Sequence, residues 1–146
     1  MESKKLAQTL KSLHISSQPL TFANVWDLAS LNMVLCLNSQ ASKPVKAIAI
    51  ASWAFAASLG IKDEELTMEQ NLASILNLAP TVALAGLPLS VDLQDGYGSR
   101  LREAVTQVYK QELMAPTLKT VSRLVVSDKG SSIRYILLMN KSVAYS

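Results

Sequence analysis

Two patterns of apolar and polar residues alternate along the chain. Nearly continuous apolar runs at 45–51 and 87–92 are short, as is typical of strands covered on both faces in a parallel sheet. An earlier extended run covers 19–23 and is closed by Asn24. Elsewhere the apolar residues recur every three or four positions, which predicts helices over 3–14, 25–38 and 53–59.

Two further helices follow from the same spacing. Thr67 and Gln70 have the spacing of a capping box at a helix start. The residues expected on the buried face of that helix are Met68, Leu72, Ile75, Leu76 and Ala79. After the run at 87–92, a Gly-Tyr-Gly turn leads into a helix whose inward residues are Leu101, Ala104, Val105 and Val108. Strands that alternate with helices in this way predict an α/β fold with a parallel sheet.

Beyond Val108 the pattern changes. Residues 120–126 and 132–139 are strand-like and flank Asp128-Lys129-Gly130, which predicts a β-hairpin. The net charge of +3 also arises here, because 1–109 hold eight basic and nine acidic residues while 110–146 hold six and two. The basic residues stand singly among apolar ones, without interleaved aromatic residues, so we expect no nucleic-acid partner.

Length and composition are those of one cored domain, with 146 residues, 49% of them apolar and 17% charged. No run approaches about 20 uninterrupted apolar residues, so we expect no membrane partner. Cys36 is the single cysteine, lies in the apolar run 33–37, and is expected to be a small buried residue. Because it excludes an intramolecular disulfide, we expect a reducing, cytoplasmic location.

The most chemically suggestive segment is 92–98, Asp-Leu-Gln-Asp-Gly-Tyr-Gly, between a predicted strand and a helix. Two acids and an amide at the carboxyl end of a strand could hold a hard divalent cation. On spacing alone, a polar turn that uses its glycines for backbone conformation is the favoured explanation of the segment.

The order of the segments strengthens the chemical interpretation. Four of them occur in order: Asn24-Val25-Trp26-Asp27; Ser52 followed by Ala56-Ala57-Ser58-Leu59-Gly60-Ile61-Lys62-Asp63; Leu66-Thr67-Met68-Glu69-Gln70; and Val91-Asp92-Leu93-Gln94-Asp95-Gly96-Tyr97-Gly98. Together they resemble the isocitrate lyase/phosphoenolpyruvate mutase superfamily, most closely its phosphoenolpyruvate-mutase-like branch, over about residues 6–108.

The resemblance implies the N-terminal part, about three βα units, of a (β/α)₈ TIM barrel. Its members make or break C–C or C–P bonds of small α-oxo acids or phosphoenolpyruvate-like substrates through an enolate stabilised by Mg²⁺. Asp92 matches the first acid of the metal site, and Gln94 falls where the family usually has Asp or Glu. Asp63 matches an acid near the reacting carbon, a catalytic position. Ser52 matches the residue that receives the substrate carboxylate, beside Trp53, which is larger than expected there.

Simpler interpretations remain open for several of these residues. Asp63 stands beside two glutamates and could belong to a solvated acidic turn. Asp27 could cap its helix or contact substrate, and Tyr97 could be a packing ring at the barrel rim. His14 has no metal-binding partner nearby in sequence and is expected to be structural or on the surface.

The chain is short for this fold, because a closed barrel takes roughly 250 residues. The G-x-N-x-E-D motif expected on the next strand is missing, but it reappears when the codons of 114–121 are read from their third base, which allows Gly-Ala-Asn-Ile-Glu-Asp-Ser. We therefore divide the chain into 1–108, the barrel portion, and 109–146, a divergent tail read out of frame.

The chain as it stands is expected to lack enzymatic activity. We expect it to form a homo-oligomer or to associate with an intact paralogue. The alternative is a non-catalytic remnant that serves as an interaction partner.

Overall fold

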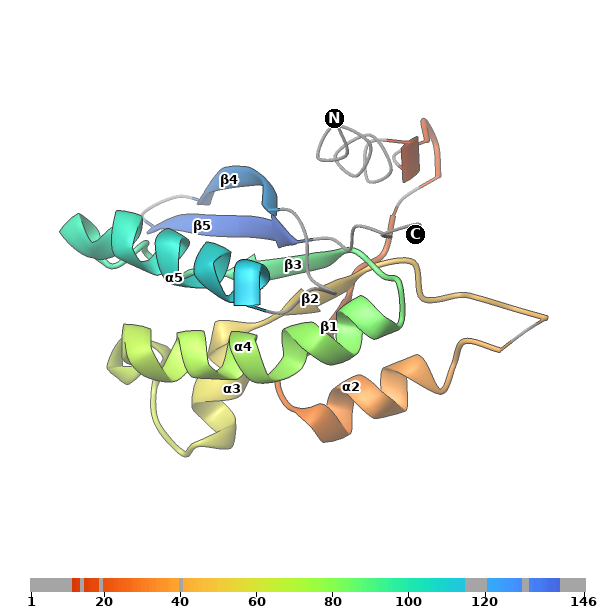
Figure 1. The fold of residues 1–146 in the computed structure, drawn as a ribbon, viewed down its shortest axis with the longest axis horizontal. Helices are drawn as coiled ribbons and strands as arrows, with labels where there is room; N and C mark the ends of the chain where they lie inside the picture. The colour runs from red at the N-terminus through yellow and green to blue at the C-terminus, as the bar shows by residue number, and fades with distance from the viewer. Residues whose placement is uncertain are drawn as a thin grey trace.

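The computed structural model describes residues 12–13, 15–18, 20–39, 41–114, 121–129 and 132–139. Its elements are, in chain order, β1 (Ala23–Val25), α2 (Leu28–Leu35), β2 (Ile48–Ile50), α3 (Ser52–Ser58), the 3₁₀ turn η1 (Asp63–Glu65), α4 (Met68–Leu84), β3 (Leu89–Asp92), η2 (Gly98–Arg100), α5 (Leu101–Met114), β4 (Val121–Lys129) and β5 (Ser132–Met139) (Figure 1).

One sheet of five strands, in the order β1-β2-β3-β5-β4, organises the molecule. β1, β2 and β3 are parallel, with Ala23 paired to Ile48 and Ile48 paired to Leu89. β5 pairs with β3 in antiparallel orientation, and β4 pairs with the other side of β5 to form a hairpin. The three parallel strands carry the α/β character that the sequence predicts, and their carboxyl ends lie at one edge of the sheet.

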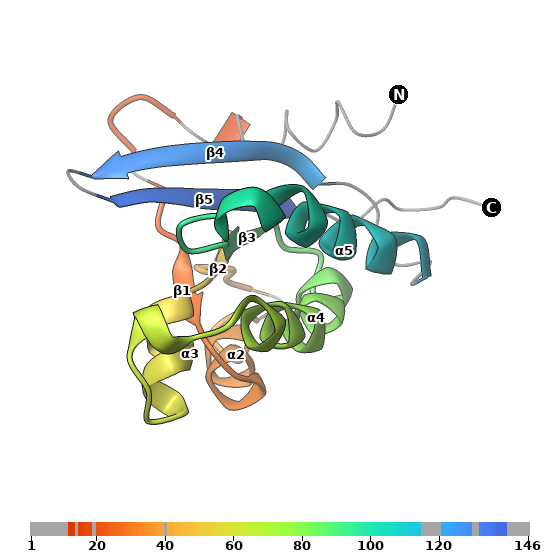
Figure 2. The same cartoon turned by 90° about the vertical axis from the view of Figure 1, so that its left-hand side faces the viewer.

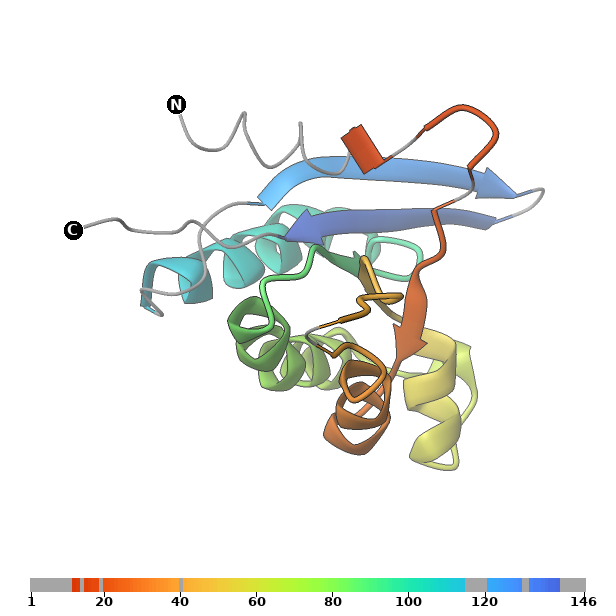
Figure 3. The ribbon, with the colours of Figure 1, turned by 90° about the vertical axis from the view of Figure 1, so that its right-hand side faces the viewer.

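Helices α2, α4 and α5 follow one another along one side of the curved sheet, while α3 stands at the end of β2 (Figures 2 and 3). The core between sheet and helices is continuous. Its largest fully buried side chains are Leu31, Ile48, Leu72, Ile75, Leu78, Leu93, Val25, Val82, Val91 and Val108. Each parallel strand contributes to this core, which explains why the strands have few polar residues.

Helix α4 confirms the capping box. The Thr67 hydroxyl accepts a hydrogen bond from the main-chain N–H of Gln70 at 3.2 Å, and the Gln70 side chain accepts one from the N–H of Thr67 at 3.0 Å. Four of the five residues expected on the buried face are buried; Leu76 is half-buried instead, and Leu78 is fully buried.

Other boundaries are narrower than predicted or shifted. The extended run expected at 19–23 is observed as Ala23–Val25, the helix expected over 25–38 is Leu28–Leu35, and the two later strands begin at Ile48 and Leu89. Most of the helix predicted over 3–14, including His14, lies outside the described residues.

Cys36 corrects one expectation, because it is exposed. It forms the C-cap of α2, five positions after the buried Leu31, and therefore faces away from the sheet. The hairpin prediction is confirmed by β4 and β5, which pair from Val121↔Met139 to Lys129↔Ser132. Across the part of the chain that the structure describes, no helix is both long and apolar enough to span a bilayer.

Candidate functional site

Three polar side chains meet beyond the carboxyl ends of β2 and β3. Ser52, fully buried at the start of α3, places its hydroxyl oxygen 3.1 Å from Oδ1 of Asp63 and 3.0 Å from Oδ2 of Asp92. Asp63 begins η1, and Asp92 is the last residue of β3. The structure thus brings together three of the residues that the sequence singles out, across separations of 11 and 40 residues.

This Ser52–Asp63–Asp92 cluster has more acceptors than donors. A serine hydroxyl carries a single hydrogen, so at any moment it can donate to only one of the two carboxylates. The other carboxylate oxygen then faces the lone pairs of the hydroxyl.

Asp92 is held from several directions. Its Oδ1 accepts the main-chain N–H of Gln94 at 2.9 Å, while Oδ2 faces Ser52. Its main-chain carbonyl accepts a hydrogen bond of 2.9 Å from Nδ2 of Asn71, a fully buried residue of α4. The carboxylate therefore has a defined orientation at the end of the strand.

Gln94 connects the loop after β3 to η1. It adopts a left-handed backbone conformation with φ of 51°, and its Nε2 donates to the main-chain carbonyl of Asp63 at 2.7 Å, with Asp63 Oδ1 at 3.4 Å. Its Oε1 is buried and has no hydrogen-bond partner within the described residues. The amide nitrogen is thus engaged by η1, whereas the amide oxygen is not.

Tyr97 lies on the other side of the loop. Its ring packs against the core, and its hydroxyl oxygen accepts a hydrogen bond of 2.6 Å from Nδ2 of Asn71. Its own N–H donates to the side chain of Asp95 at 2.9 Å, which stabilises the tight turn at Gly96. Burial raises the pKa of Tyr97 to about 12, so the phenol is neutral at physiological pH. These contacts agree with the packing interpretation of this residue.

Two residues named from the sequence lie outside these contacts. Trp53 follows Ser52 in α3, but its side chain is 65% exposed. Asp27 is the N-cap of α2, accepting the N–H of Ser30 at 2.7 Å, and this main-chain hydrogen bond lowers the pKa of Asp27. The capping interpretation of Asp27 is therefore confirmed.

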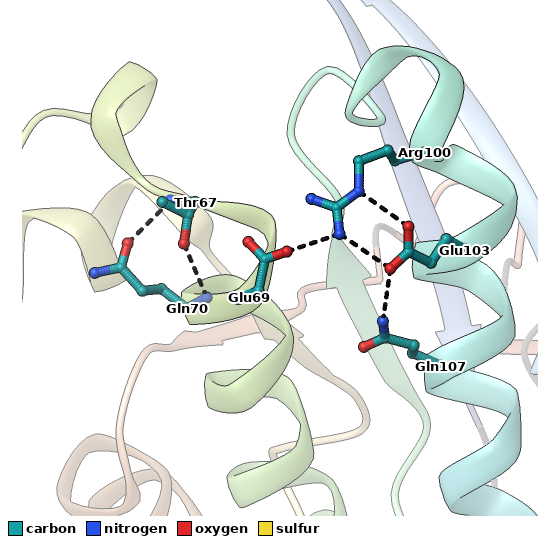
Figure 4. Close-up of polar contacts among 6 residues, drawn as sticks. All are labelled: Thr67, Glu69, Gln70, Arg100, Glu103 and Gln107. Atoms are coloured by element: carbon teal, nitrogen blue, oxygen red, sulfur yellow. Dashed lines mark hydrogen bonds and ion pairs between the residues drawn. The ribbon is translucent and has the colours of Figure 1, made fainter.

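A surface network joins the segment after this loop to α4 (Figure 4). Arg100 contacts Glu69 at 2.7 Å and Glu103 at 2.9 Å, and Gln107 donates to Glu103 at 3.1 Å. The hydrogen bonds to Glu103 and Glu69 raise the pKa of Arg100. All three charged side chains are about half exposed or more, so the network adds little stability; it joins α4 to η2, just after the loop that Asn71 contacts inside the molecule.

Asn71 is the residue that sequence reasoning missed. It carried a recognisable signal, because it lies three positions after Met68 and four before Ile75, on the apolar face of a predicted helix. A polar residue in that position is fully buried, and buried polar groups generally have specific partners.

The ligand atoms at the cluster match a hard cation in type. Asp63 and Asp92 offer carboxylate oxygens, and Gln94 offers the buried amide oxygen without a partner. Mg²⁺ is bound in proteins by oxygen ligands and retained waters, so these donors fit it. Within the described ranges, no group of three or more His, Cys, Asp or Glu residues is placed to hold a metal.

Three parallel strands with polar residues clustered beyond their carboxyl ends are the arrangement found in the N-terminal part of a lyase/mutase barrel. The family model for phosphoenolpyruvate phosphomutase matches residues 10–118, and the chain belongs to this family within the isocitrate lyase/phosphoenolpyruvate mutase superfamily.

A solved structure shows the same fold. A candidate lyase/mutase from Burkholderia cenocepacia J2315 superimposes with a TM-score of 0.58 at 24% sequence identity, over 75% of this chain. The match spans 37% of that protein, so this chain corresponds to a little over a third of its length. No curated protein sequence matches the chain.

Proposed function

We propose that the chain carries the first part of an active site for lyase or mutase chemistry on a small α-oxo acid or a phosphoenolpyruvate-like acid. The observation that supports this most directly is the Ser52 hydroxyl lying 3.1 Å from Asp63 and 3.0 Å from Asp92. A hydroxyl and two carboxylates just beyond the carboxyl ends of parallel strands stand where α/β folds bind their ligands. The family supplies the class of ligand, a small anionic acid together with Mg²⁺.

In this proposal Asp92 and the amide oxygen of Gln94 hold Mg²⁺. The cation would neutralise negative charge that develops on an oxygen of the oxo acid. Ser52 would donate its hydroxyl hydrogen to a substrate oxygen in place of a carboxylate. Asp63 would stand beside the reacting carbon, and Trp53 would border the substrate side of α3. A cytoplasmic location for this chemistry is part of the proposal.

The family reaction is tested on a protein whose reading frame is restored after codon 108. Oxaloacetate cleavage, methylisocitrate-type cleavage and phosphonopyruvate rearrangement are measured with and without Mg²⁺. We expect turnover of one of these substrates, abolished by Asp92→Ala and retained in Thr67→Ala, a change at the N-cap of α4. Absence of turnover on all three would contradict the proposal.

The 146-residue chain by itself should bind Mg²⁺ weakly. One carboxylate and a neutral amide provide little charge to replace the waters of a strongly hydrated cation, so we expect a Kd in the millimolar range or weaker, on the order of −4 kcal/mol. Gln94→Glu should tighten binding by about tenfold, because it adds the charge that the family has at this position. Calorimetric titration measures both. Micromolar affinity in the unaltered chain, lost in Asp92→Ala, would show that the charge argument is wrong.

A second candidate is a non-catalytic role in which this chain associates with itself or with an intact paralogue. It is supported by β1, which pairs only with β2 among the described strands. An unpaired edge of this kind is a template for association. Light scattering on the purified chain should show oligomers, and a monomer that melts cooperatively would contradict this role.

A further inference from the structure

Asn71 directs both hydrogens of its side-chain amide at one loop. One amide nitrogen donates to the main-chain carbonyl of Asp92 at 2.9 Å and to the hydroxyl oxygen of Tyr97 at 2.6 Å. These partners lie 21 and 26 residues further along the chain. The two hydrogen bonds therefore tie the beginning and the end of the loop from Asp92 to Tyr97 to helix α4.

Packing alone does not explain an asparagine at this position. The side chain is fully buried on a helix face whose other buried residues are almost all apolar. Its Oδ1 is buried without a hydrogen-bond partner among the described residues, which is unfavourable compared with an apolar side chain of similar shape. The favourable contribution of the asparagine is the two hydrogen bonds that its amide nitrogen donates.

The consequence reaches the carboxylate of Asp92. With its carbonyl held by Asn71, the last residue of β3 has a fixed peptide plane, from which the side chain reaches the N–H of Gln94 and the hydroxyl of Ser52. A rotation of that peptide would move the Gln94 N–H, which follows it in the chain, away from the carboxylate. Helix α4, itself anchored by its capping box, is the rigid element from which the loop is positioned.

We propose that Asn71 is a positioning residue that sets the orientation of the Asp92 carboxylate by holding the loop at Asp92 and Tyr97. The role in catalysis rests on the function proposed above; the positioning itself does not, and the two can be tested separately.

Hydrogen exchange of the Gln94 main-chain amide reports the positioning, because this amide donates to Asp92. The comparison uses the 146-residue chain, Asn71→Leu and Thr67→Ala, measured by NMR. Thr67→Ala weakens the same helix without removing a contact to the loop. We expect Asn71→Leu to accelerate exchange at Gln94 by tenfold or more relative to the amides of β2, and Thr67→Ala to change both sites by a common factor.

Tyr97→Phe provides the second variant, since it removes only the phenol oxygen and keeps the ring. It should accelerate exchange at Gln94 by a smaller factor than Asn71→Leu, and it replaces that variant if Asn71→Leu does not fold. Unchanged relative exchange in the folded variants, or an equal effect from Thr67→Ala, would overturn the positioning role.

Titration with Mn²⁺, followed by water proton relaxation, separates the two proposals. Weaker Mn²⁺ binding in Asn71→Leu than in Thr67→Ala supports both. If no protein binds Mn²⁺ while Gln94 exchange still responds to Asn71→Leu, the positioning role stands and the proposed metal site is wrong. If Mn²⁺ binds equally to all variants and Gln94 exchange is unaffected, the positioning role is wrong and the metal site stands.

Discussion

Removing the Ser52 hydroxyl tests the acidic cluster directly. In Ser52→Ala the two carboxylates at 3.1 and 3.0 Å lose their shared donor, in a position that is fully buried at Ser52. A hydrogen bond to a charged group contributes roughly 1.5–3 kcal/mol, and the partial exposure of both aspartates reduces this, so we expect a loss of about 1–2 kcal/mol in the free energy of unfolding. For a chain of this size the melting temperature should fall by roughly 3–6 °C.

Urea denaturation followed by circular dichroism measures this loss. Ser74→Ala is the matched control, because Ser74 is also a buried serine, on α4, and is not part of the Ser52–Asp63–Asp92 cluster. In a helix interior this change should be neutral or slightly stabilising. If Ser52→Ala is as stable as the unaltered chain, or more stable, the hydroxyl does not compensate the two carboxylates, and the accounting of donors and acceptors at the site is wrong.

Other predictions concern the elements around the cluster. Thr67→Ala removes the N-cap of α4 and should cost about 1 kcal/mol in thermal unfolding, whereas Thr106→Ala, on the exposed side of α5, should cost much less. The pKa of Tyr97 is about 12 in the fold and about 10 in an unfolded chain, so the unfolded state loses this proton first and stability should fall as pH rises from 10 to 12; Tyr97→Phe should flatten that slope, and an unchanged slope would show that Tyr97 is not its source. Arg100→Gln should leave unfolding at 0.5 M salt unchanged within error, because its ion pairs are exposed and screened; a clear loss at high salt would mean that the network does more than connect surface charges.

The parallel part of the fold was predictable because its signals are local. Continuous apolar runs are characteristic of buried strands, and the capping box at Thr67 marks a helix start within one residue. Boundaries were less accurate, since the ends of β2 and α2 depend on which backbone groups find partners in neighbouring strands and turns. Cys36 shows the same limit, because an apolar run says nothing about which side of a helix its last residue faces.

The site was predictable only as a set of segments. That Ser52, Asp63 and Asp92 would meet follows from the rule that carboxyl ends of parallel strands lie at one edge, together with the order of motifs. The hydrogen bonds that connect these segments could not be predicted from the sequence. Gln94 donates to Asp63, and Asn71 reaches back to Asp92 from a helix, because side-chain hydrogen bonds are decided by rotamers and by the left-handed turn at Gln94 and Tyr97.

The antiparallel direction of β5 determines which residues can lie next to Asp92 at the carboxyl end of β3. In a parallel barrel the strand beside β3 would bring its carboxyl end, and any acid there, next to Asp92. Here β5 runs the other way, so Asp92 pairs with Ile136 in the middle of β5, and Ser132, at its amino end, lies beyond the end of β3. An antiparallel neighbour places its carboxyl end at the opposite edge, beside Leu89, which pairs with Met139. No change within the last residues of β5 can therefore bring a carboxylate next to Asp92.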